Sequence, residues 1–345
     1  MKLEEIFDYA IKNEYTDIFL DEKSSIKFAK IKEIKERKEE VKKEVLDKLK
    51  EKLNGKLSTG IKINDEVFAR ITYKKDFFNL DTFTIRLLYK KYAKIDNAEE
   101  EYKRAINRIP EKKDFTGGLI LVCGETGSGK SSLIFGTLLH LAKRLPYLIN
   151  TYENPVEMLL RDKNLLGVIR QYEEPDFDKV LYHFLLSSPK IGFVSEVKTK
   201  YEIENVIDLA SRGHLIFTSI HATNVLDAIK LIAGSVDNLS LIKFAQNIYM
   251  IVAVRFVKIK NNYYQMFEVF VPSATLRLYI EEKKFKDIKR KFYFEPTKNI
   301  NSFCLKFSES LERIASRVIK DVKERKLFIA SYKKTNWFLF EDEKS

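Results

Sequence analysis

The residues with the clearest chemical meaning form the run GETGSGKS, from Gly124 to Ser131. The run has the spacing of a phosphate-binding loop, which is Gly, four residues, Gly, Lys and then Ser or Thr. An apolar strand candidate, GLILVCG, enters it, and a helix-forming stretch that begins at Lys130 leaves it. In that setting, successive backbone N–H groups face phosphate oxygens at the positive end of a helix. The sequence therefore predicts a site for a nucleoside triphosphate, namely ATP with Mg²⁺.

Individual roles in this loop follow from the same pattern. Lys130 is expected to reach the β and γ phosphates, and Ser131 to ligate the magnesium ion. The residues expected to contact nucleotide are Gly124, Thr126, Gly127, Ser128, Gly129, Lys130, Ser131 and Ser132. The competing interpretation is a glycine-rich turn in front of a purely structural helix, and the flanking strand and helix candidates argue against it.

A nucleotide site also needs carboxylates that hold the water shell of the metal or polarise the attacking water. IGFVSEV is an apolar run that ends near Glu196, and YLINTYE is another that ends at Glu153, with Glu157 one turn further. Strand ends beside the loop suit such groups, so Glu196 and Glu153 are predicted to be catalytic and Glu157 to lie near the metal. The alternative for each is an exposed acid at a strand end.

Two of the four histidines lie in the short run SRGHLIFTSIHATN. His214 stands at the start of its strand candidate and His221 at the end. A neutral imidazole can hydrogen-bond to a γ phosphate or respond to its loss. Metal ligation would require a third ligand, which the sequence does not offer. From the residues alone, a structural role explains either histidine equally well.

The region that carries these motifs alternates short apolar strands with helices. The strand candidates are GLILVCG, YLINTYE, IGFVSEV and LIFTSIH, and helices are expected from Lys130, after Phe177 and over Tyr201 to Arg212. This alternation is typical of a parallel sheet covered by helices. After Pro272 the sequence predicts mostly Lys-rich amphipathic helix.

The N-terminal part has the pattern of a separate mixed α/β unit. A helical pattern begins at Leu3, the strand candidates TDIFLDE and SIKFAKI follow, and an exposed amphipathic helix is expected over Lys30 to Lys56. Three more strand candidates, STGIKIN, EVFARITYK and DTFTIRLLYK, predict an antiparallel meander. A polar stretch around Pro110 marks the connector between domains.

Composition excludes several classes of protein. Two cysteines exclude a disulfide framework and a four-cysteine zinc site. The apolar runs are shorter than the roughly 20 residues that cross a bilayer, and the charged start is unlike a signal peptide, so a cytoplasmic chain is expected. The net charge of +12 arises from 62 basic residues interleaved with 50 acidic ones. That mixture favours a solvated, ion-paired surface over a face for nucleic acid.

Taken in order, GETGSGKS, TYENPVE, LLSSPKIGFVSEV and GHLIFTSIHATN resemble the Walker A, Asp box, Walker B and His box of the type II/IV secretion ATPase superfamily. The sequence is most similar to pilus retraction (PilT-like) ATPases, because the resemblance continues through AQNIYMIVAVRF and PSATLRLYI. It covers roughly residues 1 to 282. The four-cysteine zinc insertion usual in pilus assembly and type II motors is missing from the chain.

The resemblance implies an α/β chain with four parts: a PAS-like α+β domain at 1–97, a linker at 98–113, a RecA-like ATPase domain at 114–275 and a helical C-terminal region at 276–345. It implies a homohexameric motor for type IV pilus retraction, in twitching motility or DNA uptake, held at the inner membrane by a pilus platform protein. A paralogous ATPase fits the same assembly, whereas zinc and specific nucleic acid are not expected. The alternatives are a type IV secretion traffic ATPase and a nucleotide-binding accessory paralogue with weak turnover.

The resemblance also implies roles for individual residues. Glu196 would act on the hydrolytic water, and the Asp box and His box would supply Glu153, Glu157, His214 and His221 near the phosphates. Arg70 and Arg86 match family arginines that reach the nucleotide from the N-terminal domain, although each suits a strand-surface ion pair equally well.

Five positions depart from the family pattern: Asn154 and Thr199 replace Asp, Leu186 and Lys198 replace Arg, and Ser195 replaces Gly. The amide of Asn154 carries no charge and so holds magnesium water less tightly. Slow turnover is therefore expected.

Overall fold

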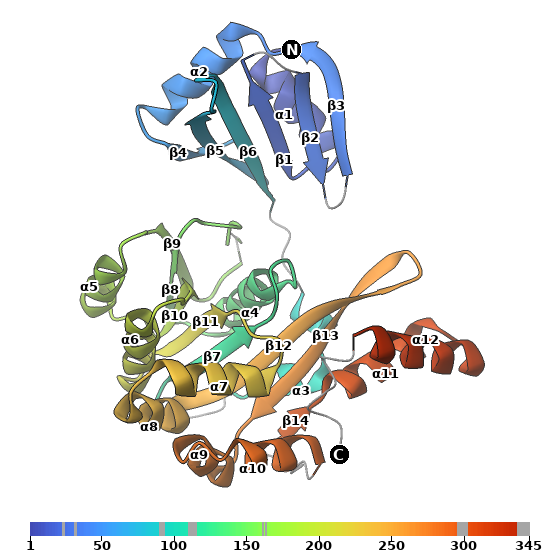
Figure 1. Cartoon of the computed structure of the whole chain (residues 1–345). Coiled ribbons are helices and arrows are strands. Elements are labelled where there is room, and N and C mark those ends of the chain that lie inside the picture. Colours follow the sequence, from blue (N-terminus) through green and yellow to red (C-terminus); the bar gives the residue numbers. More distant parts are fainter. Residues whose placement is uncertain are drawn as a thin grey trace. The chain divides into compact units, whose positions relative to one another are not determined.

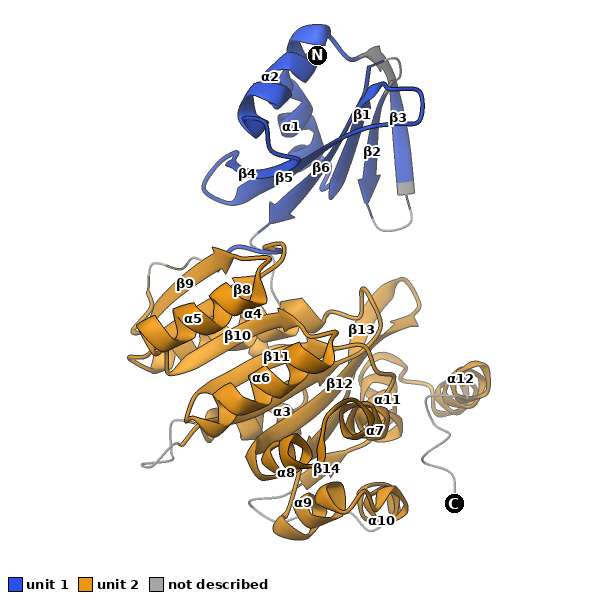
Figure 2. Cartoon of the chain, turned by 60° about the vertical axis from the view of Figure 1, so that its left-hand side comes forward, with its two compact units in different colours: residues 1–91, 157–161 blue, residues 92–156, 162–345 orange. Residues whose placement is uncertain are grey.

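The structure is a computed structural model of the chain (Figure 1). It describes residues 1–22, 25–30, 33–89, 94–109, 116–160, 162, 164–294 and 303–336. Contacts divide the chain into two compact units, coloured separately in Figure 2. The N-terminal unit comprises 1–91 with 157–161, and the C-terminal unit comprises 92–156 with 162–345. Parts of the expected linker, 110–113, and of the expected C-terminal helical region, 295–302 and 337–345, lie outside the described residues.

The N-terminal unit is a six-stranded antiparallel sheet with two helices against one face. Its elements are α1 (Leu3–Lys12), β1 (Asp17–Asp21), β2 (Ser25–Lys30), β3 (Glu33–Glu40), α2 (Lys43–Leu53), β4 (Ser58–Lys62), β5 (Val67–Lys75) and β6 (Asp81–Tyr89). Alternate residues of β1, β5 and β6 are buried with the apolar stripes of α1 and α2. The predicted antiparallel meander of β4, β5 and β6 is confirmed.

The helix predicted over Lys30 to Lys56 is wrong in its first half. Residues Glu33–Glu40 form strand β3 at the edge of the sheet, and the helix α2 begins at Lys43. Alternating Lys and Glu are as well solvated on an edge strand as on a helix, so charge alone does not distinguish the two. The buried residues at helical spacing, such as Val45 and Leu49, all fall within α2.

The C-terminal unit is built on an eight-stranded sheet with the order β14-β13-β12-β7-β11-β10-β8-β9. Its strands are β7 (Gly118–Cys123), β8 (Leu148–Glu153), β9 (Val168–Glu173), β10 (Ile191–Glu196), β11 (Leu215–Ile220), β12 (Ile248–Ile259), β13 (Asn262–Val271) and β14 (Phe303–Leu305). Its helices are η1 (Ile95–Asn97), α3 (Glu100–Asn107), α4 (Lys130–Arg144), α5 (Phe177–Ser187), α6 (Lys200–Ser211), α7 (Val225–Ser235), α8 (Asn238–Asn247), α9 (Ala274–Glu281), α10 (Phe285–Lys289), η2 (Arg290–Phe294), α11 (Phe307–Val318) and α12 (Val322–Thr335). Both sheets belong to one mixed α/β chain.

The six strands from β12 to β9 are parallel, which confirms the predicted parallel sheet. The sequence did not predict the antiparallel strands β13 and β14. After Pro272 the prediction was mostly helix, and α9 to α12 are helical, but the three residues of β14 extend the sheet. So short a strand has no visible sequence period.

The carboxyl ends of the parallel strands share one edge of the sheet, where ligands bind in open α/β folds. Cys123, the last residue of β7, lies opposite Ile220 of β11 and Ala253 of β12. Glu196 lies opposite Ser219. The segments that follow β7, β10 and β11 therefore start side by side. Within the ranges described, no helix combines the length and apolar content that a membrane span needs.

Candidate nucleotide-binding site

The glycines of the loop after β7 have backbone conformations that other residues rarely adopt. Gly124, Gly127 and Gly129 have φ angles of 151°, 79° and 89°. A Cβ atom on Gly129 would also lie 2.6 Å from the Nε2 atom of Gln265 and 3.1 Å from the ring of Phe256. The loop can therefore curl tightly only with glycine here, which leaves its backbone N–H groups available to a ligand.

Helix α4 begins directly at the end of this loop. Its N-cap is Gly129, which has no side chain to occupy the first free N–H groups of the helix. Lys130 is buried, and its Nζ atom donates hydrogen bonds to the carbonyl oxygens of Gly124 at 2.7 Å and Glu125 at 3.1 Å. The ammonium group thus lies inside the curl of the loop. A helix N-terminus with a buried cation is a binding site for an anion such as phosphate.

The other predicted loop residues differ in exposure. Thr126 is exposed, and Ser131 and Ser132 are half-buried at the start of α4. Ser128 is buried, and its hydroxyl oxygen makes no hydrogen bond to any residue that the structure describes. Its carbonyl oxygen accepts a hydrogen bond of 2.9 Å from Nε2 of Gln265 on β13. Gln265 therefore fixes the loop, and the sequence motifs did not predict it.

Glu196 ends β10 at the same edge, with its side chain mostly buried. Its Oε2 atom lies 3.4 Å from Nζ of Lys198, and its Oε1 atom is contacted by Nε2 of His221. The imidazole approaches Oε1 closely, although the contact is not aligned as a hydrogen bond. The structure thus brings together Glu196 and His221, which the sequence had proposed separately.

Glu153 is almost completely buried at the end of β8. Its Oε1 atom accepts hydrogen bonds from Thr151 at 2.7 Å and from Gln171 at 3.1 Å. These bonds hold the carboxylate at the carboxyl edge of the sheet. Glu157 belongs to the N-terminal unit, so its role near the metal stays a prediction.

His214 lies far from the phosphate-binding loop of its own chain, and its role near the phosphates stays a prediction. His214 directly precedes β11, whose first residue lies opposite Gly118 at the amino end of β7. His221 follows the last residue of the same strand. Seven residues of strand rise by about 23 Å, so the two histidines lie at opposite edges of the sheet. The Nδ1 atom of His214 lies 2.6 Å from the carbonyl oxygen of Pro189, and the ring packs against Phe184, which indicates a structural role.

Arg70 and Arg86 lie directly opposite each other on β5 and β6 in the N-terminal unit. They line a hollow of about 330 Å³ together with Thr72, Lys74, Thr82 and Thr84. Arg86 also pairs with Asp17, with its Nε atom 2.8 Å from Oδ1, so the ion-pair interpretation holds for this residue. Like charges directly opposite on a sheet are unfavourable, and the carboxylate of Asp17 offsets part of this repulsion.

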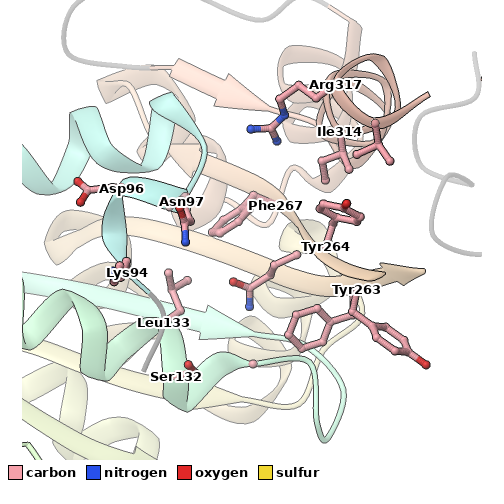
Figure 3. Close-up of a pocket in the computed structure, with 15 residues that line it drawn as sticks. Lys94, Asp96, Asn97, Ser132, Leu133, Tyr263, Tyr264, Phe267, Ile314 and Arg317 are labelled. Carbon is pink, nitrogen blue, oxygen red and sulfur yellow. The ribbon is translucent and has the colours of Figure 1, made fainter. Parts of the chain in front are cut away.

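A larger cavity, of about 520 Å³, opens beside the start of α4 in the C-terminal unit (Figure 3). Ser132 and Leu133 form one side of it, and aromatic side chains of the β12–β13 hairpin, including Tyr264 and Phe267, form another. Arg317 on α11 closes the far side. Its size and aromatic lining suit a nucleoside whose phosphates rest on the loop. The motifs gave no signal for it, because its walls come from segments far apart in the sequence.

The described residues contain no group of three or more His, Cys, Asp or Glu side chains placed to hold a metal ion. Magnesium bound through nucleotide phosphates needs only one or two protein ligands and keeps several waters. The Ser131 hydroxyl, at the start of α4, fits such a ligand.

Comparisons with known proteins agree with this arrangement. A family model described as type II/IV secretion system protein matches residues 2–268. The protein transport protein HofB homolog of Haemophilus influenzae is 28% identical over 149 residues, which are 42% of this chain and 29% of that protein. The type IV pilus retraction ATPase PilT of Pseudomonas aeruginosa is 32% identical over 118 residues, which are 34% of either chain. The chain thus aligns with only about a third of the length of these relatives.

A crystal structure of the pilus retraction motor PilT with bound ADP has a similar fold, with a TM-score of 0.73 at 20% sequence identity. The similarity covers 94% of this chain and 96% of that one. The family model alone covers well over half of the chain, including the phosphate-binding loop, Glu196 and His221. The chain therefore belongs to the type II/IV secretion system protein family.

Proposed function

We propose that this protein is a secretion-type motor ATPase, and that it powers type IV pilus retraction. The observation that carries the proposal is the carboxyl edge of the sheet, where buried Lys130 lies within the loop and Glu196 ends a strand two positions away in the sheet order. A phosphate-binding loop and a carboxylate at the end of a nearby strand of the same sheet are the two parts that hydrolysis of ATP requires.

The nucleotide would lie across the loop and the aromatic cavity. The loop amides, the N-terminus of α4 and Lys130 would bind the phosphates, and Tyr264 with Phe267 would pack against the base. A magnesium ion held by Ser131 would neutralise charge on the phosphate oxygens.

Glu196 would orient the water that attacks the terminal phosphate. Its carboxylate is mostly shielded from solvent and close to His221, so the ring can hold the carboxylate in place and respond to a change in charge at the phosphates. Glu153, fixed by Thr151 and Gln171, would hold the water shell of the metal at the same edge.

The N-terminal unit would supply Arg70 and Arg86 to a nucleotide in an assembled ring. Arginines delivered across an interface stabilise charge on the transferring phosphoryl group. We propose a homohexamer with a PAS-like domain at 1–97, a linker at 98–113, a RecA-like domain at 114–275 and a helical region at 276–345, acting on a pilus platform protein. Weak turnover is expected of single chains, because the arginines complete the nucleotide site only when chains pack together in the hexameric ring.

A nucleotide-binding accessory subunit with slow turnover is the second candidate. One contact favours it: Lys198 lies 3.4 Å from Glu196 and competes with water for the carboxylate. Asn154, which provides an amide where the family carries an acid, points the same way.

Two substitutions separate the candidates. Lys130→Ala should abolish ATP binding, and Glu196→Gln should bind ATP but not hydrolyse it. Both are measured on the full chain, by equilibrium binding and by phosphate release. Normal turnover in the Gln variant would remove Glu196 from its role, and a wild-type chain that binds ATP without turnover in its assembled form would favour the accessory subunit.

A further inference from the structure

The phosphate-binding loop carries an acidic side chain, Glu125, directly after its first glycine. The Nη1 atom of Arg255 on β12 lies 2.8 Å from Oε1 of Glu125 and donates a hydrogen bond to it. Arg255 is the more enclosed partner, with 20% of its side chain exposed against 54% for Glu125. A carboxylate in a loop that binds phosphates repels them, so the position of this arginine bears on ligand affinity.

Tyr332 on α12 interacts with Arg255. Burial raises the pKa of its hydroxyl, and the charge of the Arg255 guanidinium and a hydrogen bond from that group act in the opposite direction. The charge of Glu125 raises the same pKa. Tyr332, Arg255 and Glu125 therefore form a continuous chain of polar contacts from α12 to the loop.

The helix α12 is attached to the C-terminal unit along one side. Phe328, Ile329 and Tyr332 pack against its core, while no residue of α12 is completely buried. In Figure 1, α11 and α12 lie beside the β12–β13 hairpin. The helix follows residue 268, where the match to the family model ends. The residue that reaches Arg255 from α12 thus belongs to a part of the chain outside that match.

We propose that Arg255 and Tyr332 are positioning residues for the nucleotide site. Arg255 draws the Glu125 carboxylate toward β12 and neutralises it, so that the loop presents its amides and Lys130 to the phosphates. Tyr332 holds the guanidinium in that position, and α12 thereby sets the affinity of the loop for nucleotide. This inference rests on the proposed function, since it assumes that the loop binds phosphates.

The first test removes the positive charge in the full-length chain. Arg255→Met should weaken ATP binding by about fivefold to tenfold, because Glu125 then repels the phosphates within a few ångströms. ADP, which carries less charge, should lose less affinity, and added salt should reduce both losses. The double variant Glu125→Gln with Arg255→Met should bind ATP within about twofold of the wild type, since it lacks both charges.

The control is Lys326→Met, which removes a positive charge from the exposed side of α12 and should leave ATP binding unchanged. Circular dichroism and thermal unfolding establish that each variant is folded. If the double variant binds ATP as weakly as Arg255→Met, the arginine acts through packing and the proposal is overturned.

The second test removes only the hydroxyl oxygen of Tyr332 and keeps its aromatic ring. Tyr332→Phe should weaken ATP binding by about twofold to threefold, and this loss should disappear in the Glu125→Gln background. An unchanged affinity, or a loss that persists without the Glu125 charge, would overturn the role of Tyr332. The inference is judged on binding, whereas the proposed motor function is judged on turnover, so the two can fail separately. Wild-type chain that binds no nucleotide would overturn both.

Discussion

The Nε2 atom of His221 contacts the Oε1 atom of Glu196 where two neighbouring parallel strands end. The next strand, β7, ends opposite the residue that precedes His221, and the phosphate-binding loop starts there. The sheet therefore places an imidazole between the loop and the carboxylate. A ring in this position can hold the carboxylate that would orient the attacking water, whereas a histidine at the other edge of the sheet lies too far from Glu196 to do so.

His221→Asn should lower kcat for ATP by about tenfold or more, because Glu196 loses the group that holds it. ATP affinity should stay within about twofold of the wild type, since the loop and α4 are unchanged. The matched control is His214→Asn, at the opposite edge of the same strand, where the amide can still donate to the Pro189 carbonyl. Steady-state turnover and equilibrium binding of both variants check the prediction. Equal loss of kcat in the two would show that the edge of the strand does not matter.

The aromatic cavity should determine affinity for the nucleoside but not for the phosphates. Tyr264→Ala should weaken ATP binding by about 5-fold to 150-fold, because a stacked base loses about 1–3 kcal/mol when its aromatic partner is truncated. Inorganic tripolyphosphate should bind the variant as it binds the wild type. Tyr182→Ala on the exposed side of α5 is the control. A parallel loss of tripolyphosphate binding would place the effect in the loop instead of the cavity.

Substitutions at two glycines of the loop distinguish the effect of backbone strain from that of steric crowding. A Cβ atom on Gly127 has no neighbour within 4 Å, whereas one on Gly129 would meet Gln265, and both residues have positive φ. Gly127→Ala and Gly129→Ala should each cost about 1 kcal/mol or more of folding stability from strain. Only Gly129→Ala should also displace Gln265, so it should weaken ATP binding more than Gly127→Ala does. Adding Gln265→Ala to Gly129→Ala should restore part of the lost affinity. Equal binding by the two glycine variants would contradict the steric argument.

The sequence was informative where chemistry is encoded locally. The loop from Gly124 to Ser131 and the strand-end position of Glu196 depend on residues close together in the chain, so spacing and apolar runs sufficed. Gln265 and Arg255 could not be predicted, because they reach the loop only through the pairing of β12 with both β7 and β13.

The histidines show a different limit. His214 and His221 bracket one strand, so a motif that contains both says nothing about which edge each occupies. That answer requires the direction of β11 and its register with β7. In the N-terminal unit, β3 reads EIKERKEE, and such a mixture of charges has no apolar period that distinguishes a strand from a helix.

The N-terminal unit offers a test of stability against pH at Asp81. The carboxylate accepts hydrogen bonds from Lys50 and, at 2.7 Å, from the Tyr73 hydroxyl. The bond from Lys50 lowers the pKa of Asp81 and the bond from Tyr73 acts in the same direction, against the opposing effect of burial. The carboxylate therefore stabilises the fold at pH values above about 3.9, the ordinary pKa of Asp, and this stabilisation is lost as the pH falls through the lower folded-state pKa.

Asp81→Asn should accordingly destabilise the chain by about 1.5–3 kcal/mol at pH 7, the range for hydrogen bonds to a charged group. The difference from the wild type should shrink as the pH falls below about 4, because protonation removes the same charge from the wild type. Urea unfolding of both proteins between pH 7 and pH 3 measures it. Asp65→Asn is the control, since Asp65 is 87% exposed and its pair with Lys62 is worth little. A difference between Asp81→Asn and wild type that stays constant across this range would show that shape at position 81, rather than charge, stabilises the sheet.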